Sequence, residues 1–108
     1  MTTRDAAQLI AELWEQFRPL VDARIRVIEE YVTDREAAQV GDGRTRVSEA
    51  LRERARQAAH NLSGALGSYG RPAGSTLAAR IDGELAADTV DLDALRQTLV
   101  ELREAVSR

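Results

Sequence analysis

Apolar residues recur at three- and four-residue spacing along almost the whole chain of 108 residues. This period places apolar side chains on one face of an α-helix, and no convincing alternation of the kind expected for a half-buried strand appears. Helix-breaking residues divide the pattern at Pro19, at Gly41-Asp42-Gly43, at Gly70-Arg71-Pro72 and at Asp88-Thr89-Val90-Asp91. The pattern therefore predicts an all-α protein with five helical segments.

The first segment predicts a short N-terminal helix. Thr2 can cap it, with Asp5 three residues later as the partner in a capping box. Its apolar face consists of Leu9, Ile10, Leu13, Trp14 and Phe17. Pro19 lacks a backbone donor and its ring clashes with the preceding turn, so we expect a break or kink near Arg18.

Four longer helices are expected after this break. The second runs from about Pro19 to Gln39 and the third from about Thr45 to Tyr69. The fourth begins with Pro72 at its first position, and Asp91 is a suitable N-cap for the last. The expected inward-facing positions are Leu20, Val21, Ile25, Ile28, Tyr31, Val32, Leu51, Ala55, Ala58, Leu62, Ala65, Leu66, Tyr69, Leu77, Ala78, Ile81, Leu85, Leu92, Leu95, Leu99, Leu102 and Val106.

Short links between long amphipathic helices favour antiparallel neighbours. We therefore expect one domain over residues 1–108, built as an antiparallel up-down-up-down four-helix bundle with an extra N-terminal helix covering one end. The alternative architecture is a helical hairpin that completes its core by dimerising.

Composition excludes several classes of function. The formal net charge of −3 lacks the basic footprint expected of a nucleic-acid-binding protein. The chain has no cysteine and one histidine, which excludes disulfides, thiolate metal sites and multi-histidine metal clusters within it. No stretch approaches the roughly 18 apolar residues of a membrane span, and no signal peptide is recognisable, so we expect a cytoplasmic protein without membrane contact.

The single histidine lies on the polar side of the third predicted helix. With Val47 at zero on a helical wheel, the apolar stripe falls between roughly 0° and 100° and is centred near Leu51 and Tyr69. His60 falls at about 220°, opposite that centre. We therefore expect its imidazole to be exposed on an open helix face, where it can accept a group from a partner protein and pass it on.

Four further residues lie near His60 on the same wheel. Arg56 precedes it by one turn, Ser63 and Gly64 follow it by one turn, and Gly67 follows by two. Each glycine costs roughly 1 kcal/mol against alanine inside a helix, and the two remove side chains where another molecule would come close. The alternative for Gly67 is a fraying helix end, which explains Gly64 poorly.

The segment from Ala58 to Gly70 resembles the histidine-containing phosphotransfer (HPt) domain family. Members carry a histidine, an apolar residue two positions on, then lysine and glycine, then small residues and an aromatic. The positions that fit are His60, Leu62, Gly64, Gly67, Ser68, Tyr69 and Gly70. The order of helices around the motif agrees, so the resemblance covers most of the chain.

The resemblance implies a phosphorelay. His60 is expected to be the phosphorylated nucleophile, accepting a phosphoryl group from a receiver-domain aspartate and passing it to another receiver. The implied partners are response-regulator receiver domains or a hybrid sensor kinase, and the implied state is a monomer. Mg²⁺ is expected on the receiver and no cofactor on this chain. No phosphate-binding loop with its lysine is present, which indicates a phosphocarrier rather than a kinase that uses ATP.

One position departs from the family pattern. Ser63 stands where the family usually has a lysine that helps to neutralise the phosphoryl group. Arg56, one turn before His60, is a possible substitute cation, and the Ser63 hydroxyl can donate a hydrogen bond without adding charge. The alternative function is a non-catalytic helical adaptor that binds a signalling partner without phosphotransfer.

Overall fold

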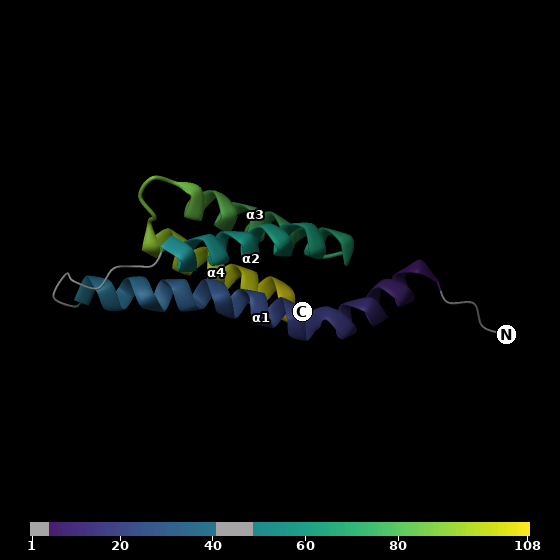
Figure 1. Cartoon of the computed structure of the whole chain (residues 1–108). Coiled ribbons are helices and arrows are strands. Elements are labelled where there is room, and N and C mark those ends of the chain that lie inside the picture. Colours follow the sequence, from purple (N-terminus) through teal and green to yellow (C-terminus); the bar gives the residue numbers. More distant parts are fainter. Residues whose placement is uncertain (1–4, 41–48) are drawn as a thin grey trace.

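The computed structural model describes residues 5–40 and 49–108, which form a bundle of four α-helices (Figure 1). The helices are α1 (Ala6–Val40), α2 (Glu49–Ser68), α3 (Pro72–Ala86) and α4 (Leu92–Ser107). Helices that follow one another in the chain pack side by side and antiparallel, and α4 returns to pack against α1. Within the described residues the backbones of the diagonal pairs, α1 with α3 and α2 with α4, do not approach each other closely. The predicted all-α, antiparallel four-helix arrangement is confirmed.

The prediction of a separate N-terminal helix is wrong, because α1 continues without interruption through Pro19. Pro19 is exposed, and a proline inside a helix commonly produces a kink rather than an end. Figure 1 shows α1 bending while remaining one helix. Its first turn is fixed by Asp5, whose carboxylate accepts a hydrogen bond of 2.7 Å from the Gln8 amide. The predicted cap, Thr2, lies outside the described residues.

The first half of α1 contacts the bundle at the corner where α2 turns into α3, and its N-terminal turns extend past the other helices (Figure 1). The Phe17 ring stacks on Tyr69 with centroids 4.9 Å apart. Trp14 is buried, and the Arg71 guanidinium lies 4.3 Å above its ring. These contacts bind the long helix to the α2–α3 corner and set its register along α2.

One hydrophobic cluster contains residues of all four helices. Its buried members are Trp14, Val21, Ile25, Ile28, Tyr31, Val32, Ala55, Ala58, Ala59, Leu62, Leu66, Ala78, Ile81, Leu85, Leu92, Leu95, Leu99 and Leu102. The inward position predicted for Leu20 is wrong, since this side chain is 44% exposed. Val21 and Ile25 hold the inward face of α1, and Leu20 lies about 100° away from Val21 around the helix axis.

The α2–α3 and α3–α4 connections contain the helix-ending and helix-capping residues that the sequence predicts. Gly70 has φ +72°, and the Arg71 amide bonds to the Leu66 carbonyl at 2.8 Å, which is the Schellman pattern at the end of α2. Pro72 opens α3. The Asp91 carboxylate accepts from the Ala94 amide at 3.1 Å and caps α4. The predicted loop at 41–43 and helix start at 45 lie outside the described residues.

The contrast between Ile25 and Leu20 gives a test of this core. Ile25 is fully buried, so Ile25→Ala should lower the free energy of unfolding by about 2–5 kcal/mol. Leu20→Ala, five residues earlier on the exposed side, should lower it by less than about 1 kcal/mol. Urea denaturation of both variants measures the difference, and equal losses would contradict the described orientation of α1.

Candidate functional site

His60 lies in the middle of α2 on the outer face of the bundle. Its side chain is 74% exposed, whereas its neighbours Ala59 and Leu62 are completely buried. The helical pattern predicted this exposure, because the buried positions of α2 recur at three- and four-residue spacing on the opposite side. The imidazole is therefore accessible from the outer surface of α2.

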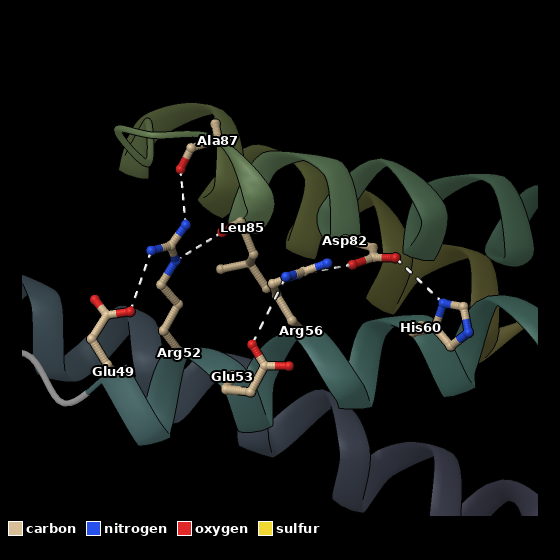
Figure 2. Close-up of polar contacts among 8 residues, drawn as sticks. All are labelled: Glu49, Arg52, Glu53, Arg56, His60, Asp82, Leu85 and Ala87. Atoms are coloured by element: carbon tan, nitrogen blue, oxygen red, sulfur yellow. Dashed lines mark hydrogen bonds and ion pairs between the residues drawn. The ribbon is translucent and has the colours of Figure 1, made fainter.

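The carboxylate of Asp82 in α3 lies beside the imidazole. The Nδ1 atom of His60 lies 3.5 Å from Oδ2 of Asp82, and the ring's other nitrogen, Nε2, faces away from that carboxylate (Figure 2). The contact of one ring nitrogen with an acceptor decides which nitrogen carries the proton. Of the two neutral tautomers, a carboxylate next to Nδ1 favours the one with its proton on Nδ1, which leaves the lone pair on Nε2.

Arg56 lies on the other side of the same carboxylate. Its Nε atom is 3.4 Å from Oδ1 of Asp82, and its NH1 is 3.8 Å from Glu53. Figure 2 shows Asp82 between the Arg56 guanidinium and the His60 ring. The positive charge of Arg56 is thus directed at two carboxylates of its own surface rather than at Nε2.

These side chains surround a shallow hollow at the α2–α3 boundary. Its volume is about 80 Å³, too small for an organic substrate. The residues that line it are Glu53, Arg56, Gln57, His60 and Asp82. The site can present a nucleophile to a partner's surface, but it does not enclose a small molecule.

Two further contacts fix α3 against the flank of α2 that carries His60. Arg52 donates hydrogen bonds of 2.9 Å to the carbonyls of Leu85 and Ala87, near the end of α3 (Figure 2). Toward the start of α3, the Ser75 hydroxyl donates to the Ser63 carbonyl at 2.6 Å. Asp82 lies between these two attachment points along α3, so its distance from His60 is set by both.

Gly64 and Gly67, which the sequence places on the same helix face, have different surroundings in the structure. A Cβ atom at Gly67 would lie 3.4 Å from the Ser75 hydroxyl oxygen, so this position lies close against α3. At Gly64 a Cβ would meet nothing within 4 Å. Gly64 therefore leaves an open, flat surface one turn after His60 that no contact inside the described chain requires.

Asp82 was missed in the sequence, although it follows Ile81 directly and lies one turn after Ala78. Both neighbours are buried, so the pattern places Asp82 at the edge of the apolar stripe of α3. That signal indicates a carboxylate near a helix boundary. It does not reveal that the residue opposite is His60, since this depends on how far α3 is shifted along α2.

Comparison with known proteins identifies one family. The family model described as the Hpt domain matches residues 12–105, from within α1 to within α4. No curated protein and no solved structure matches the chain. None of the helices in the described ranges is long and apolar enough to cross a membrane.

The contact between Asp82 and His60 predicts a tautomer. At a pH where the imidazole is neutral, the proton should reside mainly on Nδ1, and Asp82→Ala should lower that population. Long-range ¹H–¹⁵N correlation spectra of ¹⁵N-labelled protein distinguish the two ring nitrogens. Asp93→Ala, which removes an exposed carboxylate on α4, is the matched control. An unchanged tautomer ratio in Asp82→Ala would show that the carboxylate does not orient the ring.

Proposed function

The chain belongs to the Hpt domain family, and from this we propose that His60 carries the phosphoryl group in a phosphorelay. The family implies a phosphotransfer role, which requires a histidine that a partner can reach. His60 is the only histidine in the chain, and its imidazole is largely exposed. The observation that carries the proposal is the orientation of this ring, with Nδ1 toward Asp82 and Nε2 open to a partner (Figure 2).

The proposed donor is a receiver domain that bears an aspartyl phosphate. The Nε2 lone pair of His60 attacks phosphorus in line, a nitrogen–phosphorus bond forms, and the phosphorus–oxygen bond to the aspartate breaks. The electron pair of that bond leaves with the aspartate as a free carboxylate. Because Nδ1 keeps its proton, the phosphorylated ring is a cation, and the Asp82 carboxylate beside Nδ1 compensates its charge.

Transfer onward is the reverse reaction with a second receiver. The aspartate of that receiver attacks phosphorus, and the neutral imidazole leaves with its proton still on Nδ1. Asp82 therefore serves both directions as a positioning residue, because it holds the ring in the form that is both nucleophile and leaving group. The donor can equally be the receiver of a hybrid sensor kinase, since the same chemistry applies.

The surface around His60 suits a docked protein. Gly64 adds no side chain beside the ring, and Gln57 and Asn61 are exposed on the same part of α2 and hydrogen-bonded to each other at 3.2 Å. A receiver can therefore bring its aspartate up to Nε2 without displacing a bulky group. Ser63 and Gly67 belong to the flank next to α3, where Ser75 contacts both.

The positive charge that neutralises the transferred phosphoryl group must come largely from the partner. All 15 basic residues of the chain are arginines, so the lysine usual in the family has no equivalent. Arg56 faces Asp82 from the side away from His60, and Ser63 brings no charge. We therefore assign the neutralisation of the phosphoryl group to the receiver and to the Mg²⁺ that it binds.

A transfer assay tests this function. Receiver domains from the source organism are phosphorylated with a small phosphodonor and mixed with the wild-type chain or with His60→Gln. We expect phosphoryl that is labile to acid and stable to base on the wild type and none on His60→Gln, with receiver binding retained. If receivers bind both proteins equally well and active phosphorylated receivers label neither, the chain is an adaptor and the proposal fails.

Ser63→Lys tests where the neutralising charge lies. A lysine one turn after His60 restores a cation on the α3 flank, and an exposed charge pair is worth about 0.2–1 kcal/mol. The partition of phosphoryl between receiver and His60 should therefore shift toward His60 by up to about five-fold.

Gln97→Lys is the matched control for this variant. It adds the same charge at an exposed position of α4, whose backbone does not approach α2 closely. We expect no shift of the partition in Gln97→Lys. A partition that stays unchanged in Ser63→Lys would show that the missing lysine does not limit how much phosphoryl His60 holds.

A further inference from the structure

The boundary between α1 and α4 contains an apolar groove of about 520 Å³. The residues that line it are Glu29, Val32, Thr33, Glu36, Arg96, Leu99, Val100, Arg103 and Glu104. Val32 and Leu99 form part of the hydrophobic core, whereas Val100 is 54% exposed. An apolar side chain this exposed beside a groove that reaches the core indicates a surface that another apolar group can cover.

Long charged side chains bridge the two helices at this boundary. Arg103 of α4 bonds to Asp22 and Glu29 of α1 at 2.6 Å each. Arg96 of α4 reaches Glu36 of α1 at 3.1 Å. These bridges cross between the helices where apolar side chains would otherwise interdigitate, so the groove stays open between them.

The groove carries an excess of negative charge. Its lining residues and their ion-pair partners contribute five carboxylates, Asp22, Glu29, Glu36, Asp93 and Glu104. The same set contains two guanidinium groups, those of Arg96 and Arg103. The hydrogen bond from Arg103 holds the pKa of Asp22 below its usual range, so this carboxylate stays ionised at neutral pH.

The groove lies across the bundle from His60. The histidine is at the α2–α3 boundary, and the groove is at the α1–α4 boundary. Because each helix backbone closely approaches only its two neighbours, these boundaries are on opposite sides of the four-helix bundle. A protein bound in the groove would therefore leave the His60 surface free for a receiver.

We propose that the α1–α4 groove binds an amphipathic helix of a partner protein whose apolar side is flanked by arginine or lysine. The groove extends over residues 29–36 of α1 and 96–104 of α4, roughly 10–12 Å along the helices, which corresponds to about two turns of a bound helix. Apolar side chains of the partner cover Val100, and its basic side chains meet the carboxylates of the rim. A second copy of this chain is disfavoured, because the two acidic rims would repel each other.

This surface would make the chain a two-sided module. One partner stays attached at the groove while receivers exchange phosphoryl groups at His60. Attachment of this kind raises the effective concentration of a chosen receiver if receiver and groove partner belong to one complex. The binding itself does not depend on phosphotransfer, so it can be tested whether or not His60 is labelled.

Two synthetic helices of about 14 residues serve as probes. Both carry leucines along one face, and they differ in having arginines or glutamates beside that face. Fluorescence anisotropy should show the arginine peptide binding the wild-type chain at least about ten-fold more tightly than the glutamate peptide. Val100→Arg should weaken this binding about ten-fold or more, and Glu104→Gln should weaken it by up to about five-fold.

Leu20→Arg is the matched control, because it places the same charge at a similarly exposed apolar position of α1 outside the groove. It should leave binding of the arginine peptide unchanged. Equal affinity for the two peptides, or insensitivity to both Val100→Arg and Glu104→Gln, overturns the proposal. Self-association of the wild-type chain that Val100→Arg abolishes also overturns it, since the occupant is then a second copy. Phosphoryl acceptance by Val100→Arg reports separately on His60.

Discussion

The close packing of α2 against α3 is the constraint on which the site depends. Small residues permit it, because Ala59 and Ala78 are fully buried and a Cβ at Gly74 would lie only 3.1 Å from Leu66. Arg52 binds the carbonyls near one end of α3, and Ser75 binds the backbone of α2 near the other. The register between the two helices is thereby fixed, and it places the Asp82 carboxylate at His60. The contact between the exposed His60 ring and Asp82 depends on this packing.

Most of the fold was predictable from the spacing of apolar residues. Helix positions, the Asp91 cap and the inward residues of α4 follow from local rules that the structure satisfies. The two errors concern α1. Pro19 was expected to mark a break or kink between two separate helices, but the contacts of Trp14 and Phe17 with the α2–α3 corner support helix on its N-terminal side, and the chain bends within one helix. Leu20 was expected inside, yet Val21 takes the inward position.

The site was predictable only in part. The exposure of His60 follows from one helix, because the helical period alone decides which side chains face water. The carboxylate beside His60 could not be predicted in this way. Asp82 lies 22 residues away in the sequence, and it comes next to His60 only because of how α3 is aligned along α2. For the same reason the position of Arg56 beside His60 on α2 could be predicted, while its ion pair with Asp82 could not. Properties of a single helix surface are readable in a sequence, and contacts between helices require the packed structure.

In the proposed function, Asp82 holds Nδ1 of His60 on its own side of the ring and leaves Nε2 as the atom that accepts phosphoryl. The most direct measurement is the site of the nitrogen–phosphorus bond in protein carrying ¹⁵N-labelled histidine. After phosphorylation by a receiver, ³¹P–¹⁵N coupling identifies the bonded nitrogen. The account predicts coupling to Nε2 of His60 and a proton on Nδ1. Coupling to Nδ1 would contradict it, because the acceptor would then be the nitrogen that faces the Asp82 carboxylate.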